Sequence, residues 1–382
     1  MNYIEFLFWV SALLIFITWI MYPILIFLCS KFIKLGNNKS IDYYMPVSVI
    51  IAAHNEEKII KQKIEDVYSG IYPSSLLELI VASDGSSDAT VVLSKRLIKK
   101  FPTIKVLDIR PQRGRANAHN SAVKIAKGDI LVFTDADTKF DRYFLREIVA
   151  AFNNQNVGFA SGRLEYLNTE EADIQKNVNI YWKFELWMRE CESRLGLLTT
   201  GSGACCAVRK SLYREIPPTG DVDFTTPLDV VKAGFVCKYI PEAIAFDFLP
   251  NTPQAEFKAR VRMTAKNFHG TLARWGIKGF LLHPLCSISL LFHKIFRWLT
   301  PYFMLFFLMT NIFILDLSPF YIVSLSVQGV FYLWGLLGFL KISMPGTSFI
   351  SNFIMANMAF FYGVNKALFG SVPSVYKPVG QS

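Results

Sequence analysis

The sequence predicts an α/β domain with a mostly parallel sheet, combined with membrane-spanning helices on both sides of it in the chain. Between about residues 45 and 275, short apolar runs alternate with stretches of helical spacing, which is typical of βαβ units. Polar residues follow nearly every predicted strand. The chain of 382 residues is 52% hydrophobic, and its longest apolar runs lie outside this region. We therefore expect a membrane protein with one α/β domain.

Charge and cysteine content exclude other classes. The formal net charge is +10, but the sequence has no long basic run and no nucleic-acid-binding motif, so we expect no nucleic acid partner. Anionic lipid headgroups and a phosphate-bearing substrate explain the charge more simply. The six cysteines form no C-x-x-C pair and have mostly apolar neighbours. We expect reduced cysteines, and their apolar setting argues against Cys205 and Cys206 as nucleophiles.

Residues 4–29 are almost entirely apolar and long enough to cross a bilayer. A cleaved signal peptide is the competing interpretation, but the segment has no basic start, no short apolar centre and no small-residue cleavage pattern. We predict a transmembrane anchor within residues 1–34. Lys31 and Lys34 follow the apolar run, which favours a cytoplasmic position for its C-terminal end.

The first half of the α/β region has a βαβαβ pattern. A predicted helix follows each of the first three strands, and the strands cover residues 47–53, 76–82, 104–107 and 130–133. Because parallel strands end at the same edge of a sheet, the polar residues that follow them should lie together.

Asp135 and Asp137 follow the fourth strand, and this stretch organises the rest of the prediction. Two carboxylates one residue apart at this edge suit a Mg²⁺ or Mn²⁺ ion that also binds phosphate oxygens. A solvated acidic turn is the alternative, and for an isolated D-x-D it is the more common one. The polar motifs after the neighbouring strands favour the metal site.

Four motifs in this order resemble those of family 2 glycosyltransferases, which have the GT-A (Rossmann-like) fold. The family's P-x-Y-N-E, D-G-S-x-D, G-K-x-x-A-x-N and D-x-D segments correspond to residues 52–56, 84–88, 114–120 and 135–137. The resemblance extends from about Pro46 to about Trp275. It implies a nucleotide-sugar donor, with a UDP-sugar as our expectation, bound by a domain at residues 45–275.

The resemblance also implies roles for single residues. Arg115 stands where the family often has a lysine facing the donor phosphates, and Asp137 where it has a metal ligand, with Asp135 beside it near the ribose. Ala53 and His54 replace the usual Thr and Tyr beside the base, so the motifs indicate the class of donor better than its nucleotide. The donor-binding residues implied are Ala53, Glu56, Asp84, Arg115 and Asp135, with Arg260 and Arg262 as further candidates.

Residues beyond 141 should form the acceptor side. Residues 172–195 have helical spacing, and packing of their aromatic face on the sheet is favoured over stacking on a sugar. The small residues at 200–204 permit close backbone approach and resemble the family's loop at the floor of the acceptor site.

Asp221 and Asp223 are the candidate catalytic residues. Inverting transfer needs a carboxylate that removes the proton of the acceptor hydroxyl. In the family this is the Asp of an E-D pair about three helical turns before a Gly, and Asp223 holds that place before Gly234. Val222 replaces the Glu, so Asp221 is a rival. Either residue could instead cap the following helix.

Processive members of the family carry Q-x-x-R-W near the helix predicted to begin at Glu256, and this chain lacks the motif there. Arg260 and Arg262 are the nearest substitutes, because a guanidinium makes bidentate contacts with phosphate. Residues 293–298 look similar but adjoin an apolar run, so we interpret them as an interfacial anchor.

The C-terminal part has the composition of a membrane region. We expect an interfacial segment at residues 276–297 and then three spans within residues 298–370, at about 298–315, 321–340 and 349–369. The basic residues between these runs predict four spans in all, with both termini outside. Three asparagines make the last run the most polar, so a re-entrant segment is its alternative.

The sequence therefore predicts a multi-pass inner-membrane protein with a cytoplasmic, metal-dependent, inverting glycosyltransferase domain. Its acceptor is expected to be lipid-linked or a growing glycan. A processive polysaccharide synthase is one alternative, and the missing Q-x-x-R-W favours single or short transfer over it. A catalytically inactive scaffold that binds a nucleotide sugar is another, and the intact Asp135, Asp137 and Asp223 argue against it.

Overall fold

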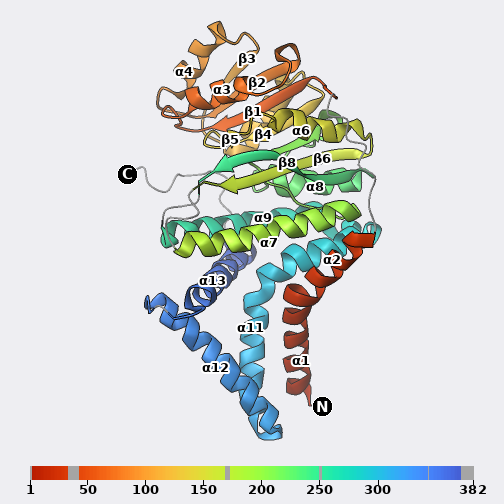
Figure 1. The fold of residues 1–382 in the computed structure, drawn as a ribbon, viewed down its shortest axis with the longest axis vertical. Helices are drawn as coiled ribbons and strands as arrows, with labels where there is room; N and C mark the ends of the chain where they lie inside the picture. The colour runs from red at the N-terminus through yellow and green to blue at the C-terminus, as the bar shows by residue number, and fades with distance from the viewer. Residues whose placement is uncertain (1, 33–42, 168–172, 249–251, 343, 371–382) are drawn as a thin grey trace.

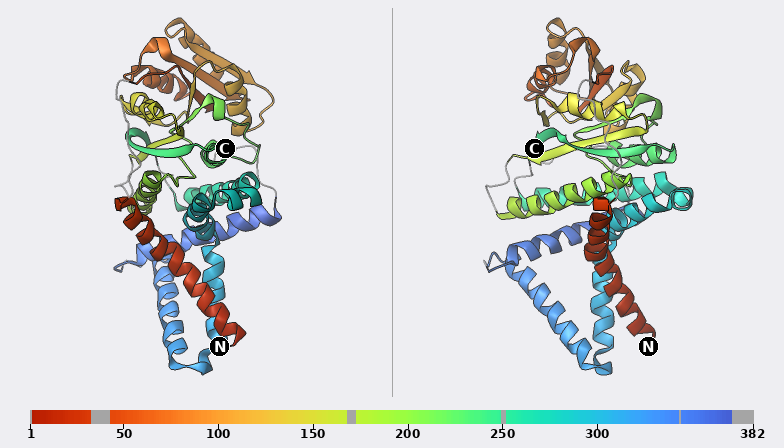
Figure 2. Two further views of the ribbon diagram at one scale, coloured as in Figure 1. Left: turned by 90° about the vertical axis from the view of Figure 1, so that its right-hand side faces the viewer. Right: turned by 45° about the vertical axis from the view of Figure 1, so that its right-hand side comes forward.

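The computed structural model describes residues 2–32, 43–167, 173–248, 252–342 and 344–370 (Figure 1). An α/β unit forms one end of the molecule. Two long helices, α7 (Asp173–Leu195) and α9 (Pro253–Leu282), lie beneath its sheet, and further helices project away from them. Figure 2 shows the same three levels from two other directions.

The sheet has eight strands in the described part of the chain, in the order β3-β2-β1-β4-β7-β6-β8-β5. The neighbours β3-β2, β2-β1, β1-β4 and β6-β8 are parallel, and the other three pairs are antiparallel. This confirms the predicted α/β class and its mostly parallel sheet. The strands are β1 (Val47–Ala53), β2 (Leu77–Asp84), β3 (Ile104–Ile109), β4 (Ile130–Thr134), β5 (Lys139–Phe140), β6 (Val157–Tyr166), β7 (Cys206–Arg209) and β8 (Val236–Asp247).

Side-chain alternation along the strands produces two cores. Val49 and Ile51 of β1 face one core, where they meet apolar residues of α3 and α6, while Ile50 faces the other. This second core contains residues of α5, α8 and α9 and extends to Trp298 of α11 and Phe360 of α13. It therefore connects the sheet to the projecting helices. The shorter helices are α3 (Ile60–Ser69), α4 (Thr90–Arg96), α5 (Arg115–Ile125), α6 (Phe144–Ala150) and α8 (Val222–Lys232).

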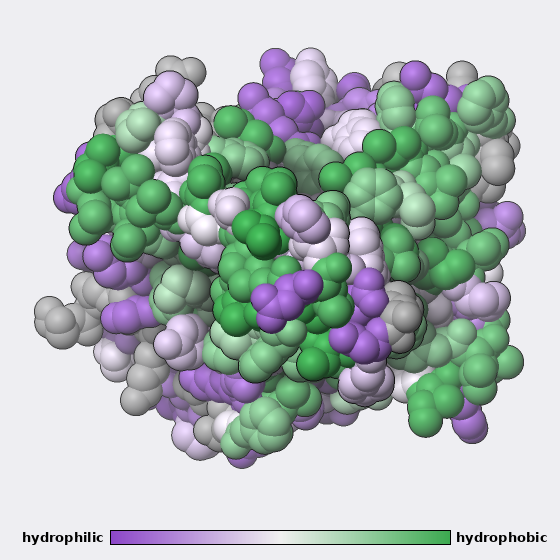
Figure 3. Space-filling model, turned by 90° about the horizontal axis from the view of Figure 1, so that it is seen from below, coloured by the Kyte–Doolittle hydropathy of each residue, from purple (hydrophilic) through white to green (hydrophobic). Residues whose placement is uncertain are grey.

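Three helices of the described residues are long and apolar enough to cross a membrane: Tyr3–Phe32, Pro284–Phe313 and Pro319–Phe339. The first consists of α1 (Tyr3–Phe16), a π turn and α2 (Tyr22–Phe32), and the second of α10 (Pro284–Leu290), a π turn and α11 (Phe296–Phe313). The third is α12 (Pro319–Phe339). Seen from below, hydrophobic residues cover much of this end of the molecule (Figure 3).

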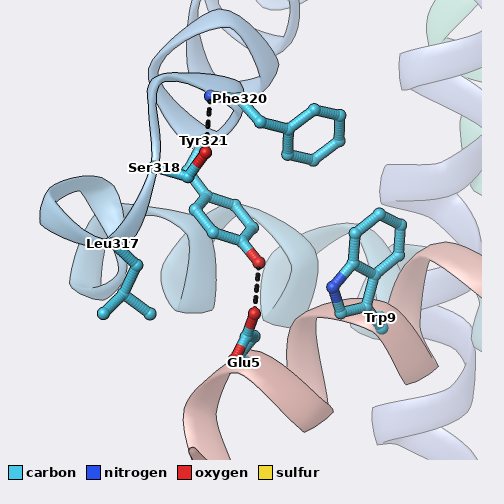
Figure 4. Close-up of a pocket in the computed structure, with 6 residues that line it drawn as sticks. All are labelled: Glu5, Trp9, Leu317, Ser318, Phe320 and Tyr321. Atoms are coloured by element: carbon cyan, nitrogen blue, oxygen red, sulfur yellow. Dashed lines mark hydrogen bonds between the residues drawn. The ribbon is translucent and has the colours of Figure 1, made fainter. Parts of the chain in front are cut away.

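Contacts at the far ends of these helices join α1 to α12. The Tyr321 hydroxyl donates to Glu5 at 2.7 Å, and both residues line a small pocket with Trp9 (Figure 4). Phe8 stacks on Phe307 of α11, with 4.7 Å between ring centroids. Aromatic packing and a partly buried hydrogen bond therefore join these helices, as is common between helices in a membrane.

The segment predicted as a fourth span, residues 349–369, is less apolar than the three candidate spans. Helix α13 (Thr347–Phe369) is long enough but is not among the three apolar helices, and it packs along α9 beneath the sheet. A Cβ on Gly363 would come within 2.6 Å of Thr264 of α9, so the two helices touch closely.

The burial of basic residues within 293–298 contradicts the interpretation of this segment as an interfacial anchor. His293, Lys294 and Arg297 are 1%, 8% and 2% exposed, and all three bind carboxylates of α7. Glu185 lies 3.0 Å from His293 Nε2, and Glu192 lies 2.9 Å from His293 Nδ1. The sequence segment alone could not reveal these partners, because they come from a helix about 100 residues earlier. Residues 284–297 also continue directly into α11 and are not a separate segment.

The pKa of Glu185 reflects this cluster. Burial alone would raise it, but the charges of His293, Lys294 and Arg189 hold it well below its usual range. Glu185 is therefore a buried carboxylate whose charge depends on cations from another part of the chain.

We predict that Glu185→Gln lowers the free energy of unfolding by about 3–5 kcal/mol, because it leaves buried cations without their counter-charge. Thermal and denaturant unfolding of the purified protein in detergent would measure this loss. Glu190→Gln is the matched control on the same helix, since Glu190 pairs with Arg194 near the surface and should cost less than about 1 kcal/mol. Equal stability of the two variants would contradict the role of the cluster.

Candidate active site

The loops after β1, β2 and β4 leave the same edge of the sheet. The parallel register pairs Ala53 with Ser83 and Ile51 with Thr134, so the chain segments that follow these strands begin side by side. They carry Glu56, Asp84, Asp135 and Asp137. The structure thus brings together the acidic residues that the sequence predicts at this edge, whereas the side chain of Ala53 is buried at 2% exposure.

Asp84 holds the loop that begins α5. Its two carboxylate oxygens accept hydrogen bonds from the backbone N–H groups of Arg113 and Gly114, at 2.9 and 2.7 Å. Gly114 has φ of 95°, in the left-handed region that favours glycine. Asp84 is 4% exposed, so it acts on this loop from inside the protein. Its contacts position the next residue, Arg115, at the first turn of α5.

Arg115 connects the two sides of the site. Its guanidinium lies 2.5 Å from Asp135 Oδ1 and donates to the carbonyl oxygen of Gly203 at 3.3 Å. A Cβ added to Gly203 would lie 3.2 Å from Arg115 Nη2 and 3.3 Å from Asp223 Oδ1. The small-residue loop therefore lies between the predicted donor residues and Asp223, and the expected close backbone approach occurs at Gly203.

Four carboxylates influence one another next to Arg115. Partial burial and the charges of Asp137 and Asp135 raise the pKa of Glu56 to about 7. Burial and Asp137 raise the pKa of Asp247 to about 7 as well, and desolvation with the charge of Asp135 raises that of Asp137. Such a cluster of negative charge favours a cation.

The carboxylate oxygens of these residues suit a divalent metal ion that also binds ligands from outside the protein. No group of three or more His, Cys, Asp or Glu side chains within the described residues is arranged to hold a metal by itself. Mg²⁺ usually takes only one or two protein carboxylates and completes its shell with water and substrate phosphates. Asp137 and Asp135 would supply these carboxylates.

Lys63 is a buried cation under this edge. Its Nζ donates to Thr134 Oγ1 at 3.0 Å and to the carbonyl oxygen of Thr138. Burial lowers its pKa to about 8, although the charges of Asp66 and Asp135 act in the opposite direction. Lys63 therefore holds the Thr134 side chain and the Thr138 backbone, which flank the D-x-D segment.

The two candidate bases differ in their surroundings. Asp221 Oδ1 accepts from Lys266 of α9 at 2.6 Å, whereas no ion pair among the described residues includes Asp223. Desolvation and the nearby Asp221 raise the pKa of Asp223 to about 6, against the opposing charge of Arg115. Asp221 occupies the N-cap position of α8, but its side chain makes no capping hydrogen bond. The geometry favours Asp223 as a proton acceptor.

The further donor candidates Arg260 and Arg262, and the aromatic face of α7, have structural partners. Arg260 Nε donates to Glu256 at 2.7 Å, and its guanidinium lies 5.4 Å from the centre of the Tyr181 ring. Arg262, two residues further along α9, also has an interaction partner. Trp182 Nε1 donates to the carbonyl oxygen of Leu164 in β6, so this part of α7 packs on the sheet.

Burial makes both adjacent cysteines poor nucleophiles. It raises the pKa of Cys205 to about 12 and that of Cys206 well above its usual value. All six cysteines of the chain are free, as expected from the sequence.

Sequence reasoning missed Asp247, Lys266 and Arg189. Asp247 ends β8, so it carries the same signal as the other strand-end acids, but β8 was not predicted as a strand. Lys266 lies in the middle of α9, and nothing in its local sequence indicates its contact with Asp221. Arg189 of α7 is 4% exposed, binds Glu185 and contributes charge near Asp223.

Comparison with known proteins identifies similar chains. Residues 48–217 match the model of "Glycosyl transferase family 2". "Probable glycosyltransferase YdaM" of Bacillus subtilis is 28% identical over 295 residues, which cover 74% of this chain and 68% of that protein. The mannosyltransferase PcManGT of Pyrobaculum calidifontis, solved with GDP-Man and Mn²⁺, has a TM-score of 0.71 at 19% identity. That match covers 95% of this chain and 99% of the other, which shows a shared fold.

Two further relatives are matched over about half their length. Beta-monoglucosyldiacylglycerol synthase of Trichormus variabilis is 27% identical over 203 residues, which cover 51% of this chain and 43% of that protein. Poly-beta-1,6-N-acetyl-D-glucosamine synthase of Staphylococcus epidermidis is 27% identical over 235 residues, which cover 60% and 56%.

We predict that the purified protein binds Mn²⁺ and that Asp137→Ala loses this binding. Binding should strengthen as the pH rises from 6 to 8, because Glu56 and Asp247, each with a pKa of about 7, give up their protons over this range. Calorimetry at several pH values would measure the affinity. Asp316→Ala, in the loop before α12, is the control and should bind normally. Undiminished affinity in Asp137→Ala would disprove the metal assignment.

Proposed function

We propose that this chain, whose residues 48–217 match the model of "Glycosyl transferase family 2", transfers a sugar from a nucleotide-sugar donor to an acceptor at a membrane, with inversion. The observation that carries this proposal is the position of Arg115. One guanidinium contacts both Asp135 and the Gly203 carbonyl, and Asp223 lies against the same glycine. A donor at the D-x-D side and an acceptor at the Asp223 side would therefore meet next to Arg115.

Asp137 and Asp135 would hold Mg²⁺ or Mn²⁺, as the two donor-side carboxylates. When bound, the ion supplies positive charge to the departing nucleoside diphosphate. Arg115 lies on the same side and would contact the donor phosphates, for which a guanidinium has suitable geometry. The presence of GDP-Man and Mn²⁺ in the similarly folded mannosyltransferase supports this class of donor and ion, and we retain a UDP-sugar as the proposed donor.

Asp223 would act as the base. At pH 7 its carboxylate is mostly ionised, because its pKa is about 6, and this raised value makes it a better proton acceptor than an ordinary Asp. The acceptor hydroxyl would give its proton to Asp223 as its oxygen attacks the anomeric carbon. Asp221 is held by Lys266 and would keep α8 in place.

The acceptor would be lipid-linked or a glycan at the membrane surface. The names of two relatives support this range, since one is a synthase of a glucosyl lipid and the other of a polysaccharide. The three candidate spans support attachment to a membrane. Lys31 at the end of the first span favours a cytoplasmic catalytic domain in a bacterial inner membrane.

Single transfer is favoured over polymerisation. Helix α9 lacks a Q-x-x-R-W segment, and Arg260, its proposed substitute, is paired with Glu256. The structure also has three candidate spans in place of the four expected from sequence, which leaves fewer helices to form a channel for a glycan. A catalytically inactive scaffold is disfavoured by the raised pKa of Asp223 beside an intact D-x-D segment.

We predict that Asp223→Asn lowers turnover by roughly two to four orders of magnitude and leaves donor affinity near normal, because the amide cannot accept the proton. In the wild type, turnover should fall as the pH drops through about 6, where Asp223 becomes protonated. Radiolabelled donor turnover and calorimetric donor binding would measure the two effects. If Asp221→Asn were inactive and Asp223→Asn active, the base would be Asp221.

We also predict one discrete product per acceptor. In liposomes with purified protein and a suitable donor, a single-transfer enzyme should give labelled material of one size that extracts with lipid. Product length at low turnover is the measurement. Long polymer at that stage, especially inside the vesicle, would support a processive synthase.

A further inference from the structure

Helix α3 holds the loop that carries the two proposed metal ligands. Asp135 and Asp137 lie between the end of β4 and the start of β5, outside the hydrogen-bonded ladder of the sheet. A metal ion needs its carboxylate ligands in defined positions, and contacts from the surrounding side chains must supply that order. Lys63 and Asp66 of α3 make such contacts.

Lys63 contacts both ends of this loop. Its ammonium group donates to Thr134 Oγ1 at 3.0 Å and to the carbonyl oxygen of Thr138. The Thr134 hydroxyl in turn donates to the carbonyl oxygen of Asp135 at 3.4 Å. Lys63 Nζ also lies 3.8 Å from the centre of the Phe140 ring. One cation therefore connects residues before, within and after the D-x-D segment.

Asp66 adds a second contact, one turn further along α3. Its carboxylate accepts a hydrogen bond from the backbone N–H of Phe140 at 2.9 Å. Residues three positions apart share a helix face, so Lys63 and Asp66 approach the loop from the same side. Phe140 belongs to β5, which pairs in antiparallel register with β8. The contacts from α3 therefore also fix the loop relative to the strand that ends at Asp247.

The burial of Lys63 is costly for a residue that only fills space. Its exposed fraction is 3%, and an ammonium group removed from water is tolerated only when it is paired and hydrogen-bonded. An apolar side chain at this place on α3 would avoid that cost. Lys63 lies near the charges of Asp66, Asp135 and Asp137. Its ammonium group therefore reduces the repulsion between the two carboxylates of the D-x-D segment before an ion binds.

We propose that Lys63 and Asp66 are positioning residues for the divalent ion, and that they hold Asp135 and Asp137 at the separation that a small octahedral ion requires. This proposal rests on the metal site of the proposed function and deepens it. Mg²⁺ demands near-ideal octahedral geometry with short bonds, whereas Ca²⁺ accepts longer and less regular coordination. A rigid D-x-D loop would therefore favour Mg²⁺ over Ca²⁺, and a loosened loop would discriminate less between them.

The test measures binding of Mg²⁺ alone and of Ca²⁺ alone to the full chain in detergent, by calorimetry. Lys63→Met removes the charge and both hydrogen bonds, and it should lower the ratio of Mg²⁺ to Ca²⁺ affinity roughly tenfold. Loss of one positive charge acts alike on two divalent ions, so this effect cancels in the ratio. Lys61→Met is the matched control, since Lys61 lies on the exposed face of α3, and it should keep the wild-type ratio.

Two variants of Asp66 test its hydrogen bond separately. Asp66→Asn keeps an acceptor for the N–H of Phe140 and should preserve the ratio, whereas Asp66→Ala should lower it. The unfolding temperature of each variant is measured on the same samples, because a purely structural role would lower this temperature and leave the ratio unchanged.

The outcomes separate this proposal from the metal site itself. An unchanged ratio in Lys63→Met and Asp66→Ala, with Mg²⁺ binding by the wild type intact, would overturn the positioning role alone. Absence of Mg²⁺ binding by the wild type would overturn the metal site and the positioning role together.

Discussion

The buried ionic cluster between α7 and the start of α11 is the interaction on which the arrangement of the whole molecule depends. Glu185 and Glu192 of α7 receive His293, Lys294 and Arg297, and Tyr22 of α2 donates to Glu192 at 2.8 Å. Charges removed from water are tolerated only when their partners are close and well oriented. Small rotations of the membrane helices would break several of these contacts at once, so the cluster fixes α2 and α11 relative to the catalytic domain.

The carboxylates at the edge of the sheet, unlike those of the ionic cluster, have few cations close to them. Glu56, Asp137 and Asp247 have raised pKa values because they are partly buried and lie near other carboxylates. Arg115 and Lys63 are the nearby positive groups, so negative charge is in excess. Such an imbalance lowers stability at neutral pH and is typical of a site adapted to bind a cation with its substrate. The protein thus pairs buried carboxylates with several cations where helices must be held, and leaves negative charge in excess where a ligand is expected.

The sequence predicted features that arise from local patterns. Apolar runs and the motifs that follow them each lie within about ten residues of sequence. They therefore identified the strands between Val47 and Thr134 and the acids at the ends of these strands. The partners of Glu185 and the contact of Lys266 with Asp221 depend on segments far apart in the chain, so no local pattern could show them. Asp247 was missed because β8 was not predicted as a strand. Helix α13 has the length of a span, but its asparagines lower its hydropathy below that of the three candidate spans.

Arg189 shows how the membrane region can influence the proposed chemistry. One edge of its guanidinium binds Glu185, the centre of the ionic cluster, while Nη1 is buried without a hydrogen-bond partner and its charge acts on Asp223. The orientation of Glu185 therefore determines the position of a positive charge near the candidate base. This positive charge favours the ionised form of Asp223. The same side chain that completes the cluster beneath the domain thus contributes to the electrostatics of the site above it.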